Sequence, residues 1–228
     1  QKKYYLVNLL KLLVKKIMIK LYDLAAKNTE IRFSPYCWLV KTVLHYKGIE
    51  FDTIPCHFTE KEKLPIPNEG KVPVITNGKD VVNDSWKIVQ YIEQIYSNNA
   101  VLDKSNETFA LFIRNWAEYF LHPAIGKVII PNLYKNVLAE CDKPYFRETR
   151  EGRLKMTFEQ LEKSHDNFRN QLKFPLSFIK KTLGENKFLL GNKPFYGDFV
   201  IFGALKWLNY SLQGSEDFKY DDVILNYF

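Results

Sequence analysis

The chain is 228 residues long, which is enough for one large domain or two small ones with a buried core. Its formal net charge is +7, but residues 1–17 contribute five lysines and no acidic residue, so the remainder carries only +2. No basic patch interleaved with aromatic residues stands out in that remainder. We therefore do not expect nucleic acid as a partner.

The cysteines of the chain, Cys37, Cys56 and Cys141, are odd in number and far apart. This pattern does not suggest a disulfide framework, and a reducing compartment fits it better, so we expect a cytoplasmic protein. His57 follows Cys56 and could begin a metal site, but no second pair of ligands has a suitable spacing. The sequence predicts no metal.

Residues 1–17 form a leader of uncertain status that is basic and leucine-rich and lacks an initiator methionine. It could be a targeting segment, an artefact of cloning or upstream translation, or an extra helix, although it lacks the Arg and Ser of a transit peptide. Its apolar stretch is too short to span a bilayer, so we expect no membrane span. We place the start of the folded domain at Met18. Residues 221–228 stop while still apolar in pattern, which indicates a truncated chain.

The first clear elements are a strand, a helix and a second strand. Residues 19–24 alternate between apolar and polar and predict a strand. Pro35 opens a helix that runs to about residue 47, where Gly48 occupies a helix-ending position. Residues 51–58 predict the second strand, and the polar stretch 59–71 predicts a short, irregular helix.

A hairpin and a helix complete the first half. Residues 72–75 and 80–82 flank Asn77-Gly78, a dipeptide typical of a tight hairpin turn. The helix predicted over residues 85–96 places one apolar stripe on a single face: Ile88, Val89, Ile92 and Ile95. The predicted order is β-α-β, a connection, then β-β-α.

After residues 97–99 the strand signals fade and helical periodicities take over. Residues 107–121 carry one aromatic stripe, residues 153–174 are amphipathic, and residues 198–212 are apolar nearly all round, which predicts a buried helix. We expect an α/β domain over residues 18–98, a linker over 99–106 and an all-helical domain over 107–228.

Three dipeptides combine into a candidate site. The turn Phe33-Ser34-Pro35-Tyr36-Cys37-Trp38 resembles that of a glutaredoxin in which the first cysteine has become serine. Ser34 could cap the helix that Pro35 opens, or it could donate a hydrogen bond to the thiolate of a ligand. A serine cannot form the disulfide that a dithiol reaction cycle requires, so a disulfide reductase is disfavoured. Cys37 is expected to be a small buried thiol.

Val72-Pro73 and Asp84-Ser85 each allow a structural and a ligand-binding interpretation. A cis peptide at Pro73 would turn the Val72 backbone toward a bound peptide, whereas an ordinary trans proline at a strand edge is more common. Asp84 and Ser85 could cap the helix over 85–96, or they could hold a ligand carrying both an ammonium and a carboxylate.

The spacing of Ser-Pro, Val-Pro and Asp-Ser resembles the glutathione-binding half of glutathione S-transferases, and the resemblance spans about residues 18–212. Within that superfamily, F-S-P-Y-C-W-L-V-K and N-D-S-W are similar to motifs of bacterial β-etherases and etherase-related fungal transferases. The resemblance implies a thioredoxin-like N-terminal domain followed by an all-helical domain, a role in detoxification, and a homodimer.

It also implies residue roles. Ser34 would stabilise the thiolate of glutathione, which acts as co-substrate, and the Val72 backbone before Pro73 would bind its cysteinyl unit. The two ends of glutathione would lie on Lys71, for the glycyl carboxylate, and on Asp84 and Ser85, for the γ-glutamyl unit. A pocket for a small hydrophobic electrophile would be lined by candidates Trp38, Trp116, Tyr119 and Phe120.

One departure concerns the buried helix, where Phe195 replaces the usual capping hydroxyl residue and Asp198 remains. Two functions stay open: a serine-type transferase, with aryl ether cleavage among its reactions, and a non-catalytic ligand-binding module with a regulatory or carrier role.

Overall fold

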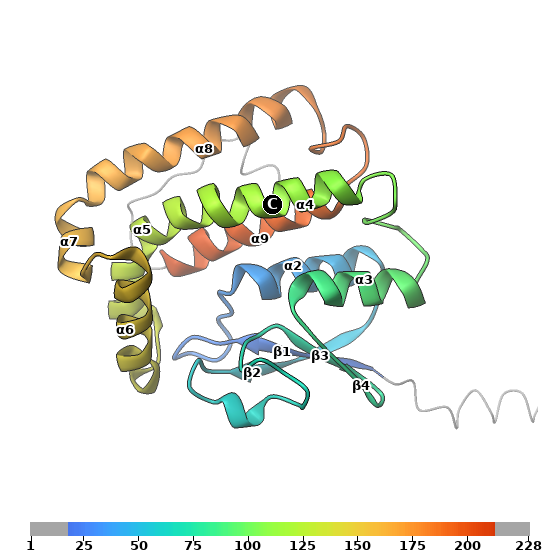
Figure 1. Cartoon of the computed structure of the whole chain (residues 1–228), viewed down its shortest axis with the longest axis horizontal. Helices are drawn as coiled ribbons and strands as arrows, with labels where there is room; N and C mark the ends of the chain where they lie inside the picture. The colour runs from blue at the N-terminus through green and yellow to red at the C-terminus, as the bar shows by residue number, and fades with distance from the viewer. Residues whose placement is uncertain (1–17, 213–228) are drawn as a thin grey trace, which may run out of the picture.

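The computed structural model describes residues 18–212, drawn in colour in Figure 1. The expectations about the leader and about a truncated end concern residues outside that range. The described residues form an α/β domain and a helical domain joined by one linker, and the core of buried apolar side chains runs through both. This is the predicted fold class.

The α/β domain contains a four-stranded mixed sheet in the order β2-β1-β3-β4. β1 pairs in parallel with β2 and antiparallel with β3, which pairs antiparallel with β4. Figure 1 shows the two helices of the domain on the side of the sheet that faces the helical domain. The elements are β1 (Ile19–Leu24), α2 (Pro35–Tyr46), β2 (Phe51–Cys56), η1 (Lys61–Lys63), β3 (Val74–Asn77), β4 (Asp80–Asn83) and α3 (Ser85–Ile95).

The hairpin turn lies one residue later than predicted. Asn77 pairs with Asp80 at the end of the ladder, so Gly78 and Lys79 form the two-residue turn. Gly78 has a φ of +63°, a conformation that glycine adopts without the clash of a Cβ atom. The Asn-Gly signal therefore located the hairpin correctly and its turn only approximately.

The helical domain begins with one long helical run that includes two π-helical turns. Figure 1 shows its first helices and its last helix lying over α2 and α3. The elements are α4 (Glu107–Trp116), η2 (Ala117–Leu121), α5 (His122–Asn132), η3 (Leu133–Val137), η4 (Glu140–Asp142), α6 (Lys143–Leu154), α7 (Phe158–Lys163), α8 (His165–Glu185) and α9 (Tyr196–Ser211).

The amphipathic helix predicted over residues 153–174 is wrong, because the chain breaks there into three helices. α6 ends at Leu154, and the next residue, Lys155, has a φ of +54°. Thr157 then starts α7 with a capping box, in which its side chain accepts from the Gln160 N–H and Gln160 accepts from the Thr157 N–H. The Met156-Thr157 step is a helix boundary that apolar periodicity alone does not reveal.

The predicted buried helix is confirmed as α9, which packs against α2. Its start is stabilised by Asp198, whose carboxylate accepts from the N–H groups of Leu189 (2.9 Å) and Phe195 (3.0 Å). The acidic member of the usual cap is thus retained, while Phe195 packs its ring in the core instead of offering a hydroxyl.

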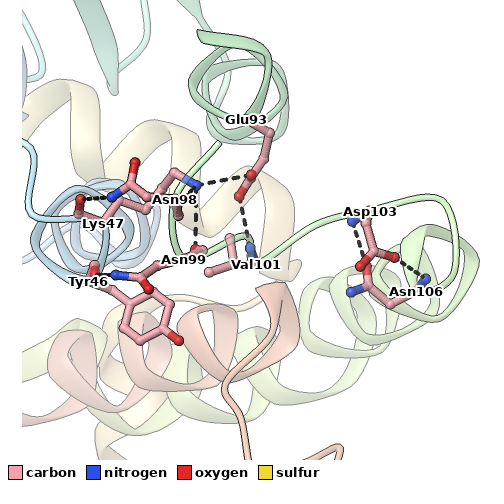
Figure 2. A network of polar contacts seen from close by, with 8 residues as sticks. All are labelled: Tyr46, Lys47, Glu93, Asn98, Asn99, Val101, Asp103 and Asn106. Carbon is pink, nitrogen blue, oxygen red and sulfur yellow. Dashed lines mark hydrogen bonds and ion pairs between the residues drawn. The ribbon is translucent and has the colours of Figure 1, made fainter. Parts of the chain in front are cut away.

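Hydrogen bonds and an ion pair hold the chain that leads to α4 against both helices of the α/β domain. The buried ammonium of Lys47 contacts the Glu93 carboxylate (3.0 Å) and the Asn98 carbonyl (2.7 Å), and the Asn98 amide donates back to the Lys47 carbonyl (2.5 Å). Glu93 also accepts from the Val101 N–H (2.9 Å), as Figure 2 shows. These contacts tie the end of α2, the end of α3 and the chain leading to α4 into one network.

None of the helices within residues 18–212 is long and apolar enough to cross a membrane.

Candidate functional site

Ser34 is the residue that caps α2. Its φ and ψ are extended, and its hydroxyl oxygen accepts from the Cys37 N–H at 3.3 Å. A hydroxyl has two lone pairs and one proton, so this bond uses Ser34 as an acceptor, and its proton lies within reach of the Cys37 thiol, a weak acceptor that an anionic ligand sulfur would displace. The side chain is 4% exposed, at the junction of the two domains. The capping role and a thiolate-stabilising role are therefore compatible.

The thiol of Cys37 is buried one helical turn beyond Ser34. Burial raises the pKa of this thiol well above its usual range, and the nearby Asp23 raises it further. Asp23 itself is buried and forms an ion pair with Lys41 at 2.8 Å, which ties β1 to α2. Cys37 is thus a neutral packing residue behind the capped helix start.

The Val72–Pro73 peptide bond is cis and lies directly before β3. The backbone N–H and C=O of Val72 form no hydrogen bond with any other residue of the 18–212 range. They are therefore left to pair with a peptide laid alongside, as in β-augmentation. Lys71 is exposed and follows Gly70, whose φ of +67° turns the chain before this segment.

Asp84 and Ser85 begin α3. Asp84 has a φ of +69°, uncommon for a residue other than glycine, and its Oδ1 accepts from the N–H groups of Trp86 (3.0 Å) and Lys87 (3.1 Å). Its Oδ2 lies 3.8 Å from the guanidinium of Arg114. Asp84 is thus a helix cap that also touches the helical domain, and the buried Ser85 stands at the helix start.

The starts of α2 and α3 meet the helical domain at one narrow pocket. The lining comprises Pro35, Tyr36, Leu39, Ser85, Arg114, Glu118, His122, Tyr196 and Val200. Ser34 precedes the first of these residues and Ser85 belongs to them. The structure therefore brings two of the predicted site residues to the same junction.

Tyr36 and His122 meet inside this pocket, with the Tyr36 hydroxyl 3.4 Å from the His122 Nδ1. Burial raises the pKa of Tyr36 to about 12, and Glu118 adds to the shift. Burial lowers the pKa of His122 to about 4. Both groups are consequently neutral near pH 7, and the Tyr36 hydroxyl is directed at His122.

The aromatic candidates for the second-substrate pocket do not line this junction. Trp38 stacks on Tyr210, with ring centroids 5.3 Å apart, and its indole N–H donates to the Arg32 carbonyl. Trp116 is partly buried against the core, whereas Tyr119 and Phe120 are 75% and 65% exposed. The structure does not gather these four side chains around Ser34.

Sequence reasoning missed the polar residues that the helical domain contributes, namely Arg114, Glu118 and His122. Arg114 donates from its Nε to Glu118 at 3.2 Å as well as approaching Asp84. The three recur at every fourth residue, which places side chains along one face of a helix. This spacing is visible in the sequence, but the prediction of a second-substrate pocket relied on the aromatic residues of the same segment.

No cluster of three or more His, Cys, Asp or Glu residues suited to a metal ion occurs within residues 18–212. The contacts at the α2–α3 junction are hydrogen bonds and ion pairs among side chains and helix ends.

Comparison with known proteins agrees with this architecture. Residues 29–100 match the family model described as "Glutathione S-transferase, N-terminal domain", and residues 108–223 match "Glutathione S-transferase, C-terminal domain". A curated zeta-class glutathione S-transferase of Euphorbia esula is 28% identical over 89 residues, covering 37% of this chain and 36% of that protein. The match therefore spans well under half the length of this relative.

Two solved fungal structures share the fold. A glutathione transferase of Phanerochaete chrysosporium is 24% identical, with a TM-score of 0.77 over 88% of each chain. A glutathione S-transferase of Ceriporiopsis subvermispora, solved in complex with glutathione, is 20% identical, with a TM-score of 0.75 over 88% of each chain. The second family match alone covers half of the sequence, and with the observed fold it establishes that this chain belongs to the glutathione S-transferase family.

Proposed function

We propose that the protein is a serine-type glutathione transferase in which the Ser34 hydroxyl stabilises the glutathione thiolate. The observation that carries the proposal is the arrangement at the start of α2. There Ser34 accepts from the Cys37 N–H, its hydroxyl proton can turn from the neutral Cys37 thiol to an anionic ligand sulfur, and the positive end of the helix dipole adds positive potential.

Glutathione would bind as an extended peptide along the edge of the α/β domain. The open backbone groups of Val72 before cis-Pro73 suit the cysteinyl unit, and the start of α3 at Asp84 and Ser85 suits the γ-glutamyl unit. Lys71 is exposed on the preceding segment and would meet the glycyl carboxylate. Glutathione acts here as a co-substrate, and the proposal needs no metal.

The chemistry is nucleophilic substitution or addition. The bound thiol loses its proton to solvent, the sulfur forms a bond to the electrophilic carbon, and in a substitution the leaving group departs with the electron pair of the broken bond. Lowering the thiol pKa by about two units requires about 2.7 kcal/mol. One charge-assisted hydrogen bond and a helix start can supply this.

The resemblance to the etherase-related subgroup adds aryl ethers to the acceptors that we propose, with an aryloxide as the leaving group. We also infer a cytoplasmic homodimer, the arrangement implied by the family resemblance. The face of α4 and η2 exposes Phe112, Tyr119 and Phe120, which is more aromatic surface than a monomer needs.

Ser34→Ala tests the proposal. We expect glutathione affinity to stay within a few-fold, because other residues hold the tripeptide, and turnover to fall by roughly ten- to a thousandfold. The pH–rate profile should move upward, since the thiol would ionise at a higher pKa without its donor. The readouts are calorimetric glutathione binding and turnover of an activated aryl halide across pH.

The matched control is Thr157→Ala, which removes the cap of α7 in the helical domain. Both variants should lose about 1 kcal/mol of stability from the lost cap, but only Ser34→Ala should lose turnover. An unchanged rate and pH profile in Ser34→Ala would limit Ser34 to capping. Glutathione binding without turnover of several electrophile types by the unmodified protein would favour the binding module.

A further inference from the structure

A cation on α6 lies beside the site without a carboxylate partner. The Arg150 guanidinium carbon is 4.8 Å from the ring centroid of Phe58 and 4.6 Å from that of Phe146. Its hydrogen-bond partners within residues 18–212 are the hydroxyls of Thr149 and Tyr145, and it forms no ion pair there. Burial lowers the pKa of Arg150, and the neighbouring charge of Arg153 lowers it further.

Other arginines of the helical domain are neutralised differently. Arg147, one turn earlier on the same helix, contacts the carboxylates of Glu151 and Glu159. Arg114 contacts Asp84 and Glu118. Arg150 is thus a partly buried guanidinium that the fold leaves without an anion, and Arg153 lies near it on the same helix.

A chain of aromatic contacts links Arg150 to the start of α2. Phe58, on which Arg150 lies, packs against Phe33 with ring centroids 6.1 Å apart, and Phe33 directly precedes Ser34. Arg150 is therefore separated from the residue before the proposed catalytic serine by one aromatic ring, and Arg153 follows Arg150 one turn later on α6.

A partly buried charge without an anionic partner loses part of its hydration at a cost, and a guanidinium does not escape that cost by losing its proton. Its planar fork of N–H groups matches a carboxylate in a bidentate arrangement. The surroundings of Arg150 are aromatic, with Phe58, Phe146 and Tyr145 in contact with it or with each other. A ligand with a carboxylate attached to an aromatic body would satisfy the charge and the apolar surface together.

We propose that Arg150, assisted by Arg153, binds the carboxylate of the second substrate, so that the acceptor class of this protein is aromatic acids. The inference rests on the proposed function, because it names the acceptor of that reaction. It assigns a specificity role to α6, whereas the glycyl carboxylate of glutathione is left to Lys71.

The test compares two electrophiles of one shape, 4-chloro-3-nitrobenzoate and 4-chloro-3-nitrobenzamide. In each, the glutathione sulfur bonds to the ring carbon that carries chlorine, chloride leaves with the bonding pair, and the thiol proton goes to solvent. Each kcat/KM is divided by the uncatalysed rate of its compound, which removes the difference in intrinsic reactivity. Binding of both compounds is also measured by calorimetry without glutathione.

We expect the benzoate to be preferred over the benzamide by about tenfold or more in both measurements, the range of a hydrogen bond to a charged group. Arg150→Met should lower that ratio by about tenfold, and Arg150→Lys should lower it less. Arg147→Met is the matched control: it removes the same charge from the same helix, at a residue whose partners are glutamates, and should keep the ratio.

The failure of each proposal is distinguishable. Turnover of both compounds with a ratio that Arg150→Met leaves unchanged overturns this inference and keeps the transferase. Preferential binding of the benzoate that depends on Arg150, without turnover of either compound, keeps the anion site and overturns the transferase. A loss of glutathione affinity instead of benzoate affinity in Arg150→Met overturns the assignment to the acceptor. If Arg150→Met does not fold, the same outcomes are read from Arg153→Met, whose side chain is exposed.

Discussion

At the start of α2 the Ser34 hydroxyl accepts from the Cys37 N–H, and its proton, which the neutral Cys37 thiol accepts only weakly, can be donated to a ligand. Capping a helix and stabilising a thiolate use the same hydroxyl in different ways. The cap needs a lone pair of the oxygen to accept an N–H, and the thiolate needs the hydroxyl proton. A hydroxyl meets both at once, whereas a carboxylate could serve only as the cap. This explains why a serine at this position is suited to a site that must also begin a helix.

His122 is the residue whose titration has the clearest consequence. Burial lowers its pKa in the folded protein to about 4, below the value of about 6.5 in an unfolded chain. The unfolded state therefore takes up a proton between these values while the folded state does not, so stability falls as pH falls from 7 toward 4. By this linkage we expect a loss of about 2 kcal/mol between pH 7 and pH 5.

Urea unfolding of the native protein and of His122→Phe at both pH values measures this loss. The variant keeps an aromatic ring against Tyr36 and Trp207 but cannot titrate, so its stability should change by about 2 kcal/mol less over the same range. Equal pH dependence in the two proteins would mean that His122 is hydrated or protonated in the fold.

At the scale of elements, local signals predicted the α/β domain well and the helical domain only in part. The strand at residues 19–24, the helix opened by Pro35 and the hairpin each have a signal contained within a few residues. The break between α6 and α7 consists of the left-handed residue Lys155 and the capping box that starts at Thr157. Both lie inside a continuous amphipathic pattern, so a prediction based on apolar periodicity runs one helix through them.

The residues of the candidate site also fall into those that local sequence signals predict and those that they do not. Ser34 and Ser85 lie at the starts of α2 and α3, and Val72 lies just before β3, positions where capping residues and proline give strong local signals. The contributions of Arg114, Glu118 and His122 depend on how the long helix rotates against the α/β domain. That rotation is a tertiary property, and no local pattern determines which face of the helix meets α2.

The packing of α9 on α2 determines where the start of α2 lies, and Gly203 lies close to the α2 backbone. A Cβ atom at this position would be 2.3 Å from the Pro35 carbonyl oxygen and 3.2 Å from the Leu39 backbone nitrogen. Because both neighbours are backbone atoms, Gly203→Ala should push the helices apart. We expect a loss of about 1–3 kcal/mol in urea unfolding and a lower turnover, since Pro35 follows Ser34.

Gly184→Ala is the control for this substitution. It lies in α8, and apart from its chain neighbours and the adjacent helix backbone no atom lies within 4 Å of its Cβ position. The higher helix propensity of alanine should make this variant equally stable or more stable by up to about 1 kcal/mol, with unchanged turnover. A Gly203→Ala variant that behaves like the control would show that α2 and α9 separate without cost.

At the scale of the whole molecule, the two domains are joined by contacts on opposite sides of the site. The Lys47–Glu93–Asn98 network fastens the linker at the far ends of α2 and α3. On the other side, Asp142 at the start of α6 is buried and accepts from the N–H groups of Phe58 and Thr59, each at 3.0 Å. The candidate site lies between these two sets of polar interdomain contacts, so its geometry depends on both domains.

Asp142→Ala tests that dependence. It leaves two backbone N–H groups and the Thr59 hydroxyl, which donates to Asp142 at 2.9 Å, without their acceptor. Unpaired buried donors that previously met a charged group should lower the free energy of unfolding by about 3 kcal/mol. Glu140→Ala, two residues earlier and exposed, removes only a surface contact with Lys143 and should cost less than about 0.5 kcal/mol.

The functional consequence of Asp142→Ala follows from chain connectivity. Residues 57–59 lead into the segment that ends at Lys71 and Val72, which we propose to bind glutathione. Loss of the Asp142 contacts should therefore make the positions of Lys71 and Val72 less well defined. We expect the KM for glutathione to rise several-fold while kcat changes less, because Ser34 belongs to a different segment held by β1, α2 and α9. Steady-state kinetics on the folded variant measures both parameters. A fall in kcat with an unchanged KM would mean that the contact positions the α2 start instead of the glutathione-binding segment.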